Sequence, residues 1–410
     1  MAQEKSNLQA EVVQEALLSD PDFLRSLTEH TLQRIIDQQF DEQIGAQPYE
    51  RAEERKGWRN GNRSRSIRTR VGTIDLIVPR DREGCFKTSL FERYNRSEKA
   101  LVQVMQEMVI KGVSTRKVTE VVETLCGTEV SASLVSDLSA QLDDELAAWR
   151  NRQLETTYPI IILDATYQKV RHAGHVVPQA VAIVTGVNGN GHRSVLSLDV
   201  FHSENETEYG ELFERLKERG LKGVRLVVSD DHSGLQKALQ RHFSGVLWQR
   251  CQVHYTKNLL DKLRKKDKKV IKQSLRDVFE APCRKKAEER FAELAGYLRE
   301  LRYADTADWL EESFPDTLSV YAFPREFHKR IRSTNSIERL NEELRRRVRV
   351  LRIFPNRASC LRMNTALCQD MDERWSTGKR YLDMALLREQ DLEAIKLEIN
   401  DGDILARASF

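Results

Sequence analysis

Apolar residues recur at two different spacings along the chain, and the change of spacing divides it into segments. Between residues 158 and 250, short apolar runs are separated by polar turns, as in strands, with two amphipathic stretches of helical spacing among them. Elsewhere, apolar residues three and four positions apart predict helices over 7–44, 97–146 and 255–330. The pattern predicts a mixed α/β domain flanked by helical segments.

The α/β segment has a definite order of elements. The predicted elements are strands 160–163, 179–187, 194–201, 224–229 and 246–248, with helices over 206–218 and 235–243 before the fourth and fifth strands. Three antiparallel strands followed by two parallel strands joined by helices are the order of a ribonuclease-H-like core. In that order the first and fourth strands are neighbours, so the residues that follow them are expected to face each other.

Both of those strands are predicted to end in a carboxylate, Asp164 and Asp230. A single Asp after a strand is more often a turn former or a helix cap, but an ionised Asp at the margin of a core needs a positive partner, for example a divalent cation. Glu338 is a third candidate, in the first turns of a helix predicted to start near residue 333. Three such carboxylates suit a pair of Mg²⁺ ions that activate a water or a 3′-hydroxyl in phosphoryl transfer.

Alternatives exist for two of these positions. Asp231 could replace Asp230, although it is expected to lie past the strand end, in the turn. Glu342 shares a helix face with Glu338, whereas Glu343 is rotated about 100° from Glu342. Because Glu342 lies one turn, about 5.4 Å, further along the axis, and because the amides and dipole at the helix N-terminus favour the first position, we expect Glu338 to complete the site.

Composition and cysteine usage narrow the class of protein. The chain of 410 residues is long enough for two or three domains. It has no apolar run near 18 residues, and its first residues are polar, unlike a signal peptide. These two features predict a cytoplasmic protein. The six cysteines include no CxxC pair, which indicates reduced thiols. Cys251 and His254 form a CxxH pattern; a zinc site would need a second pair of ligands, so local packing or hydrogen bonding is the favoured reading.

Basic residues cluster more strongly than the net charge of +3 suggests. Two arginine-dense segments, 55–82 and 330–352, indicate contacts with a polyanion, although a solvated helix face is an alternative for the second. Predicted helices over 97–111, 114–125 and 131–146, separated by glycine stops and serine starts, are similar to a helix-turn-helix unit or, alternatively, to a bundle that links two domains. The candidate DNA contacts are Arg59, Arg63, Arg65, Arg116, Lys117, Arg345, Arg346 and Arg347.

Seven motifs occur in the order of a known family. They are the stretches at 57–62, 78–82, 112–116, 158–165, 228–235, 249–254 and 333–341. Together they resemble the DDE transposases of bacterial insertion sequences of the 256 family, allied to the eukaryotic mutator-like transposases. The resemblance implies that Asp164, Asp230 and Glu338 are the catalytic triad and metal ligands, that Cys251 and His254 are the CxxH element, and that a helical insertion precedes the glutamate. This sequence departs from the family at 231, often glycine, and at 333, often threonine; neither position belongs to the triad.

The fold class that we expect is α/β, with a ribonuclease-H-like catalytic core that contains a helical insertion and follows a mostly helical DNA-binding region. The resemblance implies a Mg²⁺-dependent transposase, with Mn²⁺ able to substitute, that binds the terminal inverted repeats of its insertion sequence, cleaves there and transfers strands to target DNA. The expected partners are double-stranded DNA and further copies of the chain, in a homodimer or higher homo-oligomer near the bacterial nucleoid and away from membranes. The alternatives are a catalytically inactive DNA-binding regulator and a structure-selective nuclease with the same core.

These elements predict seven consecutive segments. They are an N-terminal helical region (1–50), a basic strand-bearing segment (51–96), a helix-turn-helix-like DNA-binding region (97–150), the first part of the core (151–254), the helical insertion (255–330), the glutamate helix with the completion of the core (331–375), and a C-terminal helical tail (376–410). In the second segment, residues 66–70 and 73–79 are predicted to pair as a small hairpin about Gly72, with residues 74, 76 and 78 alternating against 73, 75 and 77.

Overall fold

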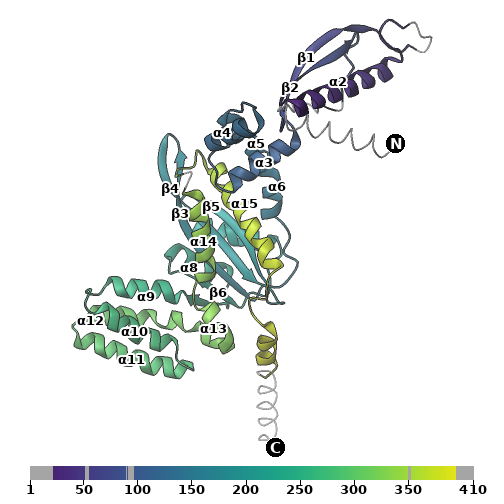
Figure 1. The fold of residues 1–410 in the computed structure, drawn as a ribbon. Coiled ribbons are helices and arrows are strands. Elements are labelled where there is room, and N and C mark those ends of the chain that lie inside the picture. The colour runs from purple at the N-terminus through teal and green to yellow at the C-terminus, as the bar shows by residue number, and fades with distance from the viewer. Residues whose placement is uncertain (1–21, 51–54, 89, 91–96, 350–351, 394–410) are drawn as a thin grey trace, which may run out of the picture. The chain divides into compact units, whose positions relative to one another are not determined.

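The computed structural model describes residues 22–50, 55–88, 90, 97–349 and 352–393 (Figure 1). The chain forms two compact units, residues 1–141 and 142–410. Each unit has hydrophobic cores of its own. The finer division into seven segments stays a prediction.

The N-terminal unit starts with a helix packed on a hairpin. Helix α2 (Phe23–Ile44) lies against strands β1 (Arg59–Thr69) and β2 (Gly72–Asp81), and its buried apolar residues share a core with those of β2. Along β2, buried Ile74, Leu76 and Val78 alternate with less buried neighbours, as the hairpin pattern predicted. The hairpin is confirmed and is longer than expected, while residues 7–21 of the first predicted helical region lie outside the described residues.

Three short helices follow: α3 (Lys99–Ile110), α4 (Thr115–Cys126) and α5 (Ala132–Ala140). Ser114 and Ser131 cap α4 and α5, since their hydroxyls accept bonds from the backbone amides of Lys117 and Leu134. The prediction of one helix over 131–146 is wrong. A separate helix, α6 (Asp143–Arg150), starts after α5 ends, and the three acidic residues in its first turn favour a new helix N-terminus there.

The second unit is built on a mixed five-stranded sheet with the order β5-β4-β3-β6-β7. Strands β3 (Ile160–His172), β4 (His175–Val187) and β5 (Arg193–Phe201) form an antiparallel meander, and β6 (Leu226–Ser229) and β7 (Leu247–Arg250) run parallel to β3. The expected pairing of the first strand with the fourth is therefore confirmed, and the fold is of the mixed α/β class.

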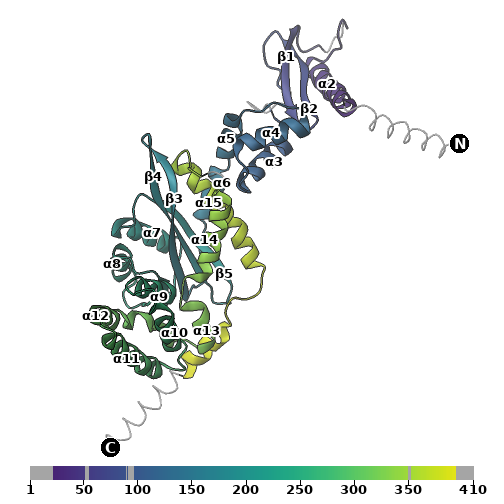
Figure 2. The same ribbon diagram turned by 60° about the vertical axis from the view of Figure 1, so that its left-hand side comes forward.

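Helices cover both faces of this sheet (Figure 2). Helices α7 (Glu206–Glu218) and α8 (Ser233–His242) lie on one face, where their apolar residues pack with Ile161 and Leu163 of β3. Helices α14 (Asn335–Val348) and α15 (Arg357–Ser376) lie on the other. Since side chains alternate along a strand, Asp164 and Gln168 of β3 point to the face of α14 and α15.

The predicted helical insertion is a cluster of helices with its own core. It comprises α9 (Gln252–Asp261), α10 (Lys268–Phe279), α11 (Arg284–Glu300), α12 (Ala304–Ser313), two 3₁₀ turns (Pro315–Thr317 and Ser319–Ala322) and α13 (Arg325–Ile331). The fold over 255–330 is helical, as its periodicity predicted. Among the described helices, none has the length and apolar character that crossing a membrane requires.

Candidate active site

Asp164 lies inside β3 and not at its end. The prediction of a strand that stops at residue 163 is wrong, because β4 pairs with β3 along its whole length as far as the tight turn at Ala173 and Gly174, both of which have positive φ. Pairing with β4 thus extends β3 beyond its apolar run. Asp164 is the first charged residue of a long strand.

The other edge of β3 is only partly paired. Strand β6 pairs with Ile160, Ile161 and Ile162 alone, and further along Phe354 forms a bridge at Val170. Within the described residues, the edge from 164 to 168 has no strand partner, and Asn341 of α14 bonds to Asp164 at the start of this stretch. Asp164 therefore lies just past the last residue of β3 that pairs with β6, where α14 contacts β3.

Asp230 lies at the corresponding position of the neighbouring strand. Ile162 pairs with Val228 in the parallel register, and Asp164 and Asp230 each come two residues later. The Oδ2 atom of Asp230 lies 3.7 Å from Nδ1 of His254, on α9. The two aspartates therefore stand side by side at the same level of adjacent strands.

Asp231 has a different partner. Its Oδ2 atom lies 2.7 Å from Nη2 of Arg250, a side chain that is only 3% exposed, and Gln236 donates to its Oδ1 atom. Because a buried guanidinium needs a counter-charge, Asp231 is held by Arg250. This arrangement favours Asp230 over Asp231 as the partner of Asp164.

The carboxyl group of Asp164 is buried among charges. Burial raises its pKa to about 6, and the charges of Asp230 and Glu338 add to the increase, while His254 opposes it. The Nδ2 group of Asn341, a buried residue of α14, donates a hydrogen bond of 2.8 Å to Oδ2 of Asp164. Asn341 comes three positions after Glu338, so the same helix supplies both a charge and a hydrogen bond to Asp164.

The three glutamates of α14 differ in their surroundings. Glu338 is exposed in the first turn of the helix, and its charge acts on Asp164. Glu343 accepts hydrogen bonds from Arg346 and Arg347, which lower its pKa to about 2. Glu342 is exposed one turn beyond Glu338. Among these three, the environment favours Glu338 as the third member of the site.

Cys251 contacts both β6, which precedes Asp230, and the start of α14, which carries Glu338. It is fully buried, and its backbone amide donates to Ser229 O over 2.7 Å. Its Sγ atom accepts from the amide of Thr334 at 3.4 Å, immediately before α14, and lies 3.5 Å from the Thr334 hydroxyl. The expected serine or threonine start is therefore present at Thr334, but its side chain contacts Cys251 and does not cap the helix.

His254 lies one turn further along α9 and faces the aspartates. A hydrogen bond with Cys251 raises its pKa to about 9, and the charges of Cys251, Asp230 and Asp164 add to the increase, against the effect of burial. The imidazolium thus offsets part of the negative charge of the site. Cys251 thus makes hydrogen bonds to Thr334, and the role of the Cys251 and His254 pair stays a prediction.

The donor set at this site fits a divalent cation. Asp164, Asp230 and Glu338 offer only oxygen atoms, and Mg²⁺ in proteins is bound through one or two carboxylates, with waters and substrate phosphates as the other ligands. Burial and, to a smaller extent, the charges of Asp230 and Glu338 raise the pKa of Asp164, and a bound cation would stabilise its ionised form. In the described part of the chain, no three His, Cys, Asp or Glu side chains are already gathered closely enough to hold a metal ion between them.

Comparison with known proteins identifies the family. The model of the family described as "Transposase, Mutator family" matches residues 1–378. The chain belongs to this family. A transposase for insertion sequence element ISRM5 from Rhizobium meliloti is 45% identical over 386 residues, which cover 94% of this chain and 96% of that protein. The transposase for IS256 in transposon Tn4001 from Staphylococcus aureus is 40% identical over 88% of this chain and 92% of its own length, and that for IS1081 from Mycobacterium tuberculosis is 36% identical over 91% and 92%.

The predicted DNA contacts of this Mutator-family chain differ in their availability. In the N-terminal unit, Arg63 and Arg116 are exposed and Arg65 is partly exposed on β1. Lys117 is exposed and pairs with Glu120 on its own helix. Arg59 instead donates to Asp41 and to Ala46 O, at 2.6 and 2.8 Å, and stacks over Phe40. This placement gives Arg59 a role in joining β1 to α2.

The arginines of α14 also divide. Arg345 and Arg346 are exposed, although Arg346 bonds to Glu343. The side chain of Arg347 is only 12% exposed, with Glu343 at 2.8 Å and Asp370 of α15 at 3.7 Å. Arg347 therefore fastens α14 to α15. The contact of each of these residues with DNA stays a prediction.

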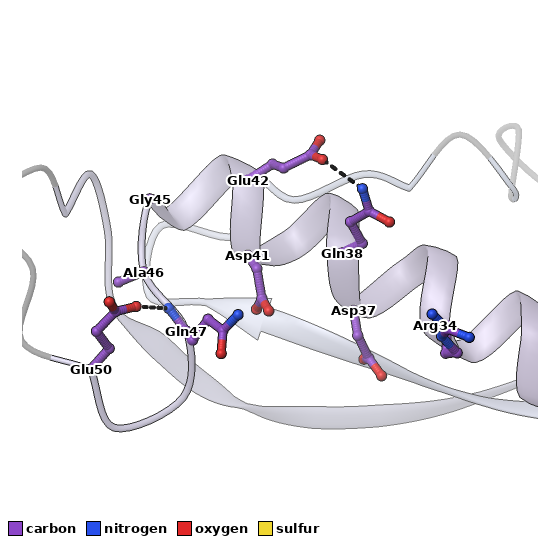
Figure 3. A pocket seen from close by; sticks show the side chains of 9 residues that line it. All are labelled: Arg34, Asp37, Gln38, Asp41, Glu42, Gly45, Ala46, Gln47 and Glu50. Atoms are coloured by element: carbon purple, nitrogen blue, oxygen red, sulfur yellow. Dashed lines mark hydrogen bonds between the residues drawn. The ribbon is translucent and has the colours of Figure 1, made fainter.

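A hollow beside α2 is unsuited to DNA. Figure 3 shows its lining, to which α2 and the following loop contribute four carboxylates, Asp37, Asp41, Glu42 and Glu50. All four accept hydrogen bonds: Asp37 from Gln33, Asp41 from Arg59, Glu42 from Gln38 and Glu50 from the amide of Gln47. Such a lining repels phosphate, and Asp41 within it is the residue that holds Arg59.

The sequence did not single out Asn341 or Arg250. Asn341 stands in the 333–341 motif at a helical spacing of three from Glu338, which would have been a usable signal. Arg250 ends β7 and shows its role only through its contact with Asp231. Both residues control the orientation of a carboxylate at or beside the site.

Proposed function

We propose that the chain is the transposase of a bacterial insertion sequence and that it cleaves and joins DNA strands at Asp164, Asp230 and Glu338. The observation that carries this proposal is the placement of Asp164 and Asp230 at adjacent parallel strands, with Asn341, from the helix of Glu338, bonded to Asp164. The similar proteins named as transposases of insertion sequence elements support it, since they match nearly the whole chain. The strand order β5-β4-β3-β6-β7 supports a ribonuclease-H-like core.

The proposed cofactor is Mg²⁺, with Mn²⁺ as a substitute. When bound, it would supply Lewis-acid activation of a water or a 3′-hydroxyl and would stabilise the leaving oxygen. Asp164 and Asp230 would hold it from adjacent strands, and Glu338 would contribute from α14. Asn341 donates to one oxygen of Asp164, which would hold the carboxylate in one orientation for the cation.

His254 and Cys251 act behind the carboxylates in this proposal. The charged imidazole lies beside Asp230 and offsets the repulsion between the two aspartates before a cation binds. The sulfur of Cys251 holds the amide of Thr334, and with it the start of α14. These contacts set the distance from Glu338 to the two strands.

The proposed substrates are the terminal inverted repeats of the element and a target DNA. We assign end recognition to residues 1–150, whose hairpin and short helices carry exposed basic residues, Arg63 and Arg116 among them. An oligomer would bring the two ends of the element together, so the acting form would be a homodimer or a larger assembly.

A strand-transfer assay tests the proposal. Full-length protein is incubated with Mg²⁺, a labelled duplex of the element's end and a supercoiled target. Asp164→Asn, Asp230→Asn and Glu338→Gln should each abolish cleavage and joining while end binding stays within about tenfold, because the carboxylates hold metal and not DNA. Glu342→Gln, on the same helix, is the matched control and should remain active.

Other outcomes would identify the alternatives. End binding without cleavage by the unmodified protein, with Mg²⁺ or Mn²⁺, would indicate a DNA-binding regulator. Cleavage without joining, and without preference for the inverted repeat, would indicate a structure-selective nuclease. Full activity of Asp164→Asn would contradict the assigned site.

A further inference from the structure

Three arginines that lack acidic partners gather at one edge of the second unit. Arg193 begins β5, Arg330 lies on α13 and Arg339 follows Glu338 on α14. Among the described residues, no carboxylate forms an ion pair with any of the three. Other buried arginines of this unit have partners within the chain, since Arg250 pairs with Asp231 and Arg219 donates to the carbonyl oxygens of Arg152 and Leu196. The positive charge of Arg193, Arg330 and Arg339 is therefore open to neutralisation by an anion from outside the chain.

Aromatic rings hold the cluster in place. The guanidinium carbon of Arg193 lies 3.7 Å from the centre of the Trp375 ring and 4.6 Å from that of the Tyr381 ring. The guanidinium carbon of Arg330 lies 5.0 Å from the same Tyr381 ring. The two guanidinium groups are therefore within about 10 Å of each other. Stacking of this kind fixes a guanidinium in its plane and leaves its edge to donate hydrogen bonds.

Tyr381 is itself fixed by the backbone. Its amide donates to Gly191 O at 2.7 Å, and its hydroxyl donates to Arg330 O at 3.2 Å. Gly191 has a φ of 84°, and a Cβ atom there would lie 1.9 Å from Leu382 O, so this close approach of the two segments requires glycine. The ring that supports both arginines is thus part of a built structure.

The electrostatics of the cluster are those of an anion site. Burial lowers the pKa of Arg193, and the nearby charges of Arg339 and Arg330 lower it further. Its Nε–H group is buried and has no hydrogen-bond partner in the structure. Arg330 and Arg339 are exposed, so an anion can reach them from solvent. A phosphate group that accepts hydrogen bonds from Arg330 and Arg339 would relieve the repulsion between the three cations.

We propose that Arg193, Arg330 and Arg339, supported by Tyr381 and Trp375, form a binding site for backbone phosphates of DNA. Arg339 directly follows Glu338 in α14, so one member of the site shares a helical turn with a proposed catalytic residue. A strand whose scissile phosphate lies at the carboxylates would continue over Arg339 toward Arg330 and Arg193. The inference rests on the proposed function, since it takes DNA as the substrate, and it adds a contact that fixes the path of the strand beside the site.

Salt-dependent binding tests this site apart from catalysis. Full-length protein without divalent metal is titrated against a labelled 40-bp duplex of random sequence, between about 50 and 200 mM salt. Arg330→Gln and Arg339→Gln should each weaken binding about threefold and reduce the slope of log K against log salt by about 1, as the loss of one phosphate contact does. Arg299→Gln is the matched control, because Arg299 is exposed on α11 but already paired with Asp308 and Glu311.

Arg193 needs a second variant, since its removal also takes away the stacking that it makes. Arg193→Lys, which keeps the charge, should retain most of the salt slope, whereas Arg193→Gln should lose about 1 from it. Equal slopes for the unmodified protein, Arg330→Gln and Arg339→Gln would overturn the inference, whether or not the protein cleaves DNA. Reduced slopes in a protein that does not cleave would uphold it and contradict only the proposed catalytic function.

Discussion

Asn341 donates a hydrogen bond of 2.8 Å to Asp164, across 177 positions of the sequence. The bond joins α14 to β3. Asn341 lies about one turn after Glu338 on α14, so the helix that carries Glu338 also holds the carboxylate of Asp164. A single amide thereby sets the relation between two of the three candidate metal ligands.

Replacement of Asn341 by alanine should weaken metal binding more than it weakens the fold. Loss of an outer hydrogen bond to a metal ligand typically costs 10–100-fold in metal affinity or activity, and we expect the Mg²⁺ concentration for half-maximal cleavage to rise by about that factor. The free energy of unfolding should fall by about 1–2 kcal/mol. Titration of cleavage with Mg²⁺ and unfolding in urea measure the two effects. An unchanged Mg²⁺ requirement, together with lost stability, would show that Asn341 is only structural.

The stability of the metal-free protein should depend on pH through Asp164. Its pKa in the folded protein, about 6, lies above its usual value of 3.8, so the folded state holds the proton more tightly. The resulting stability is fully present below about pH 4 and is lost as the pH rises through 6, by about 3 kcal/mol at most. Urea unfolding in chelator at several pH values should show this loss in the unmodified protein and in Glu342→Gln. Asp164→Asn should lack it, and a parallel loss in that variant would assign the effect to another group.

Asp230 and Asp231 should respond to substitution in opposite ways. Asp230→Ala should abolish cleavage, whereas Asp231→Ala should leave the buried Arg250 without its counter-charge and lower the free energy of unfolding by about 2 kcal/mol. At a temperature where both variants are folded, Asp231→Ala should still cleave. Thermal unfolding and end cleavage, measured on the same samples, check the pair. Cleavage by Asp230→Ala, with none by Asp231→Ala, would exchange their roles.

Cys251 should act as a positioning residue without zinc. Cys251→Ala removes the acceptor of the Thr334 amide, so a buried donor is left unpaired, at a cost of about 1–3 kcal/mol. The cleavage rate of Cys251→Ala should fall together with its stability. Cys251→Ser should restore part of the stability and part of the cleavage rate, because a hydroxyl also accepts a hydrogen bond. A zinc-selective chelator should have no effect on the unmodified protein. Inactivation by that chelator, reversed by Zn²⁺ and not by Mg²⁺, would establish a metal site at Cys251 and His254.

The sequence by itself determined the elements and the identity of the candidate residues. The meander, α7, the helical insertion and the helix of Glu338 follow from periodicities that span a few residues, which are local properties of the chain. The pairing of the first and fourth strands also followed, because few topologies can join such elements. Asp164, Asp230 and Glu338 were identified in the same way, from their positions after apolar runs and in a first helical turn.

Only the tertiary structure decided how those residues are used. Strand β3 extends past Asp164 because β4 pairs with it, and Asp231 turns to Arg250 because β7 lies beside β6. Asn341 reaches Asp164 and Cys251 reaches Thr334 over sequence separations of 177 and 83 residues. A local sequence pattern does not reveal such distant partners, although each buried polar group needs a hydrogen-bond partner. The choice among neighbouring carboxylates was therefore made by the partners that the fold supplies.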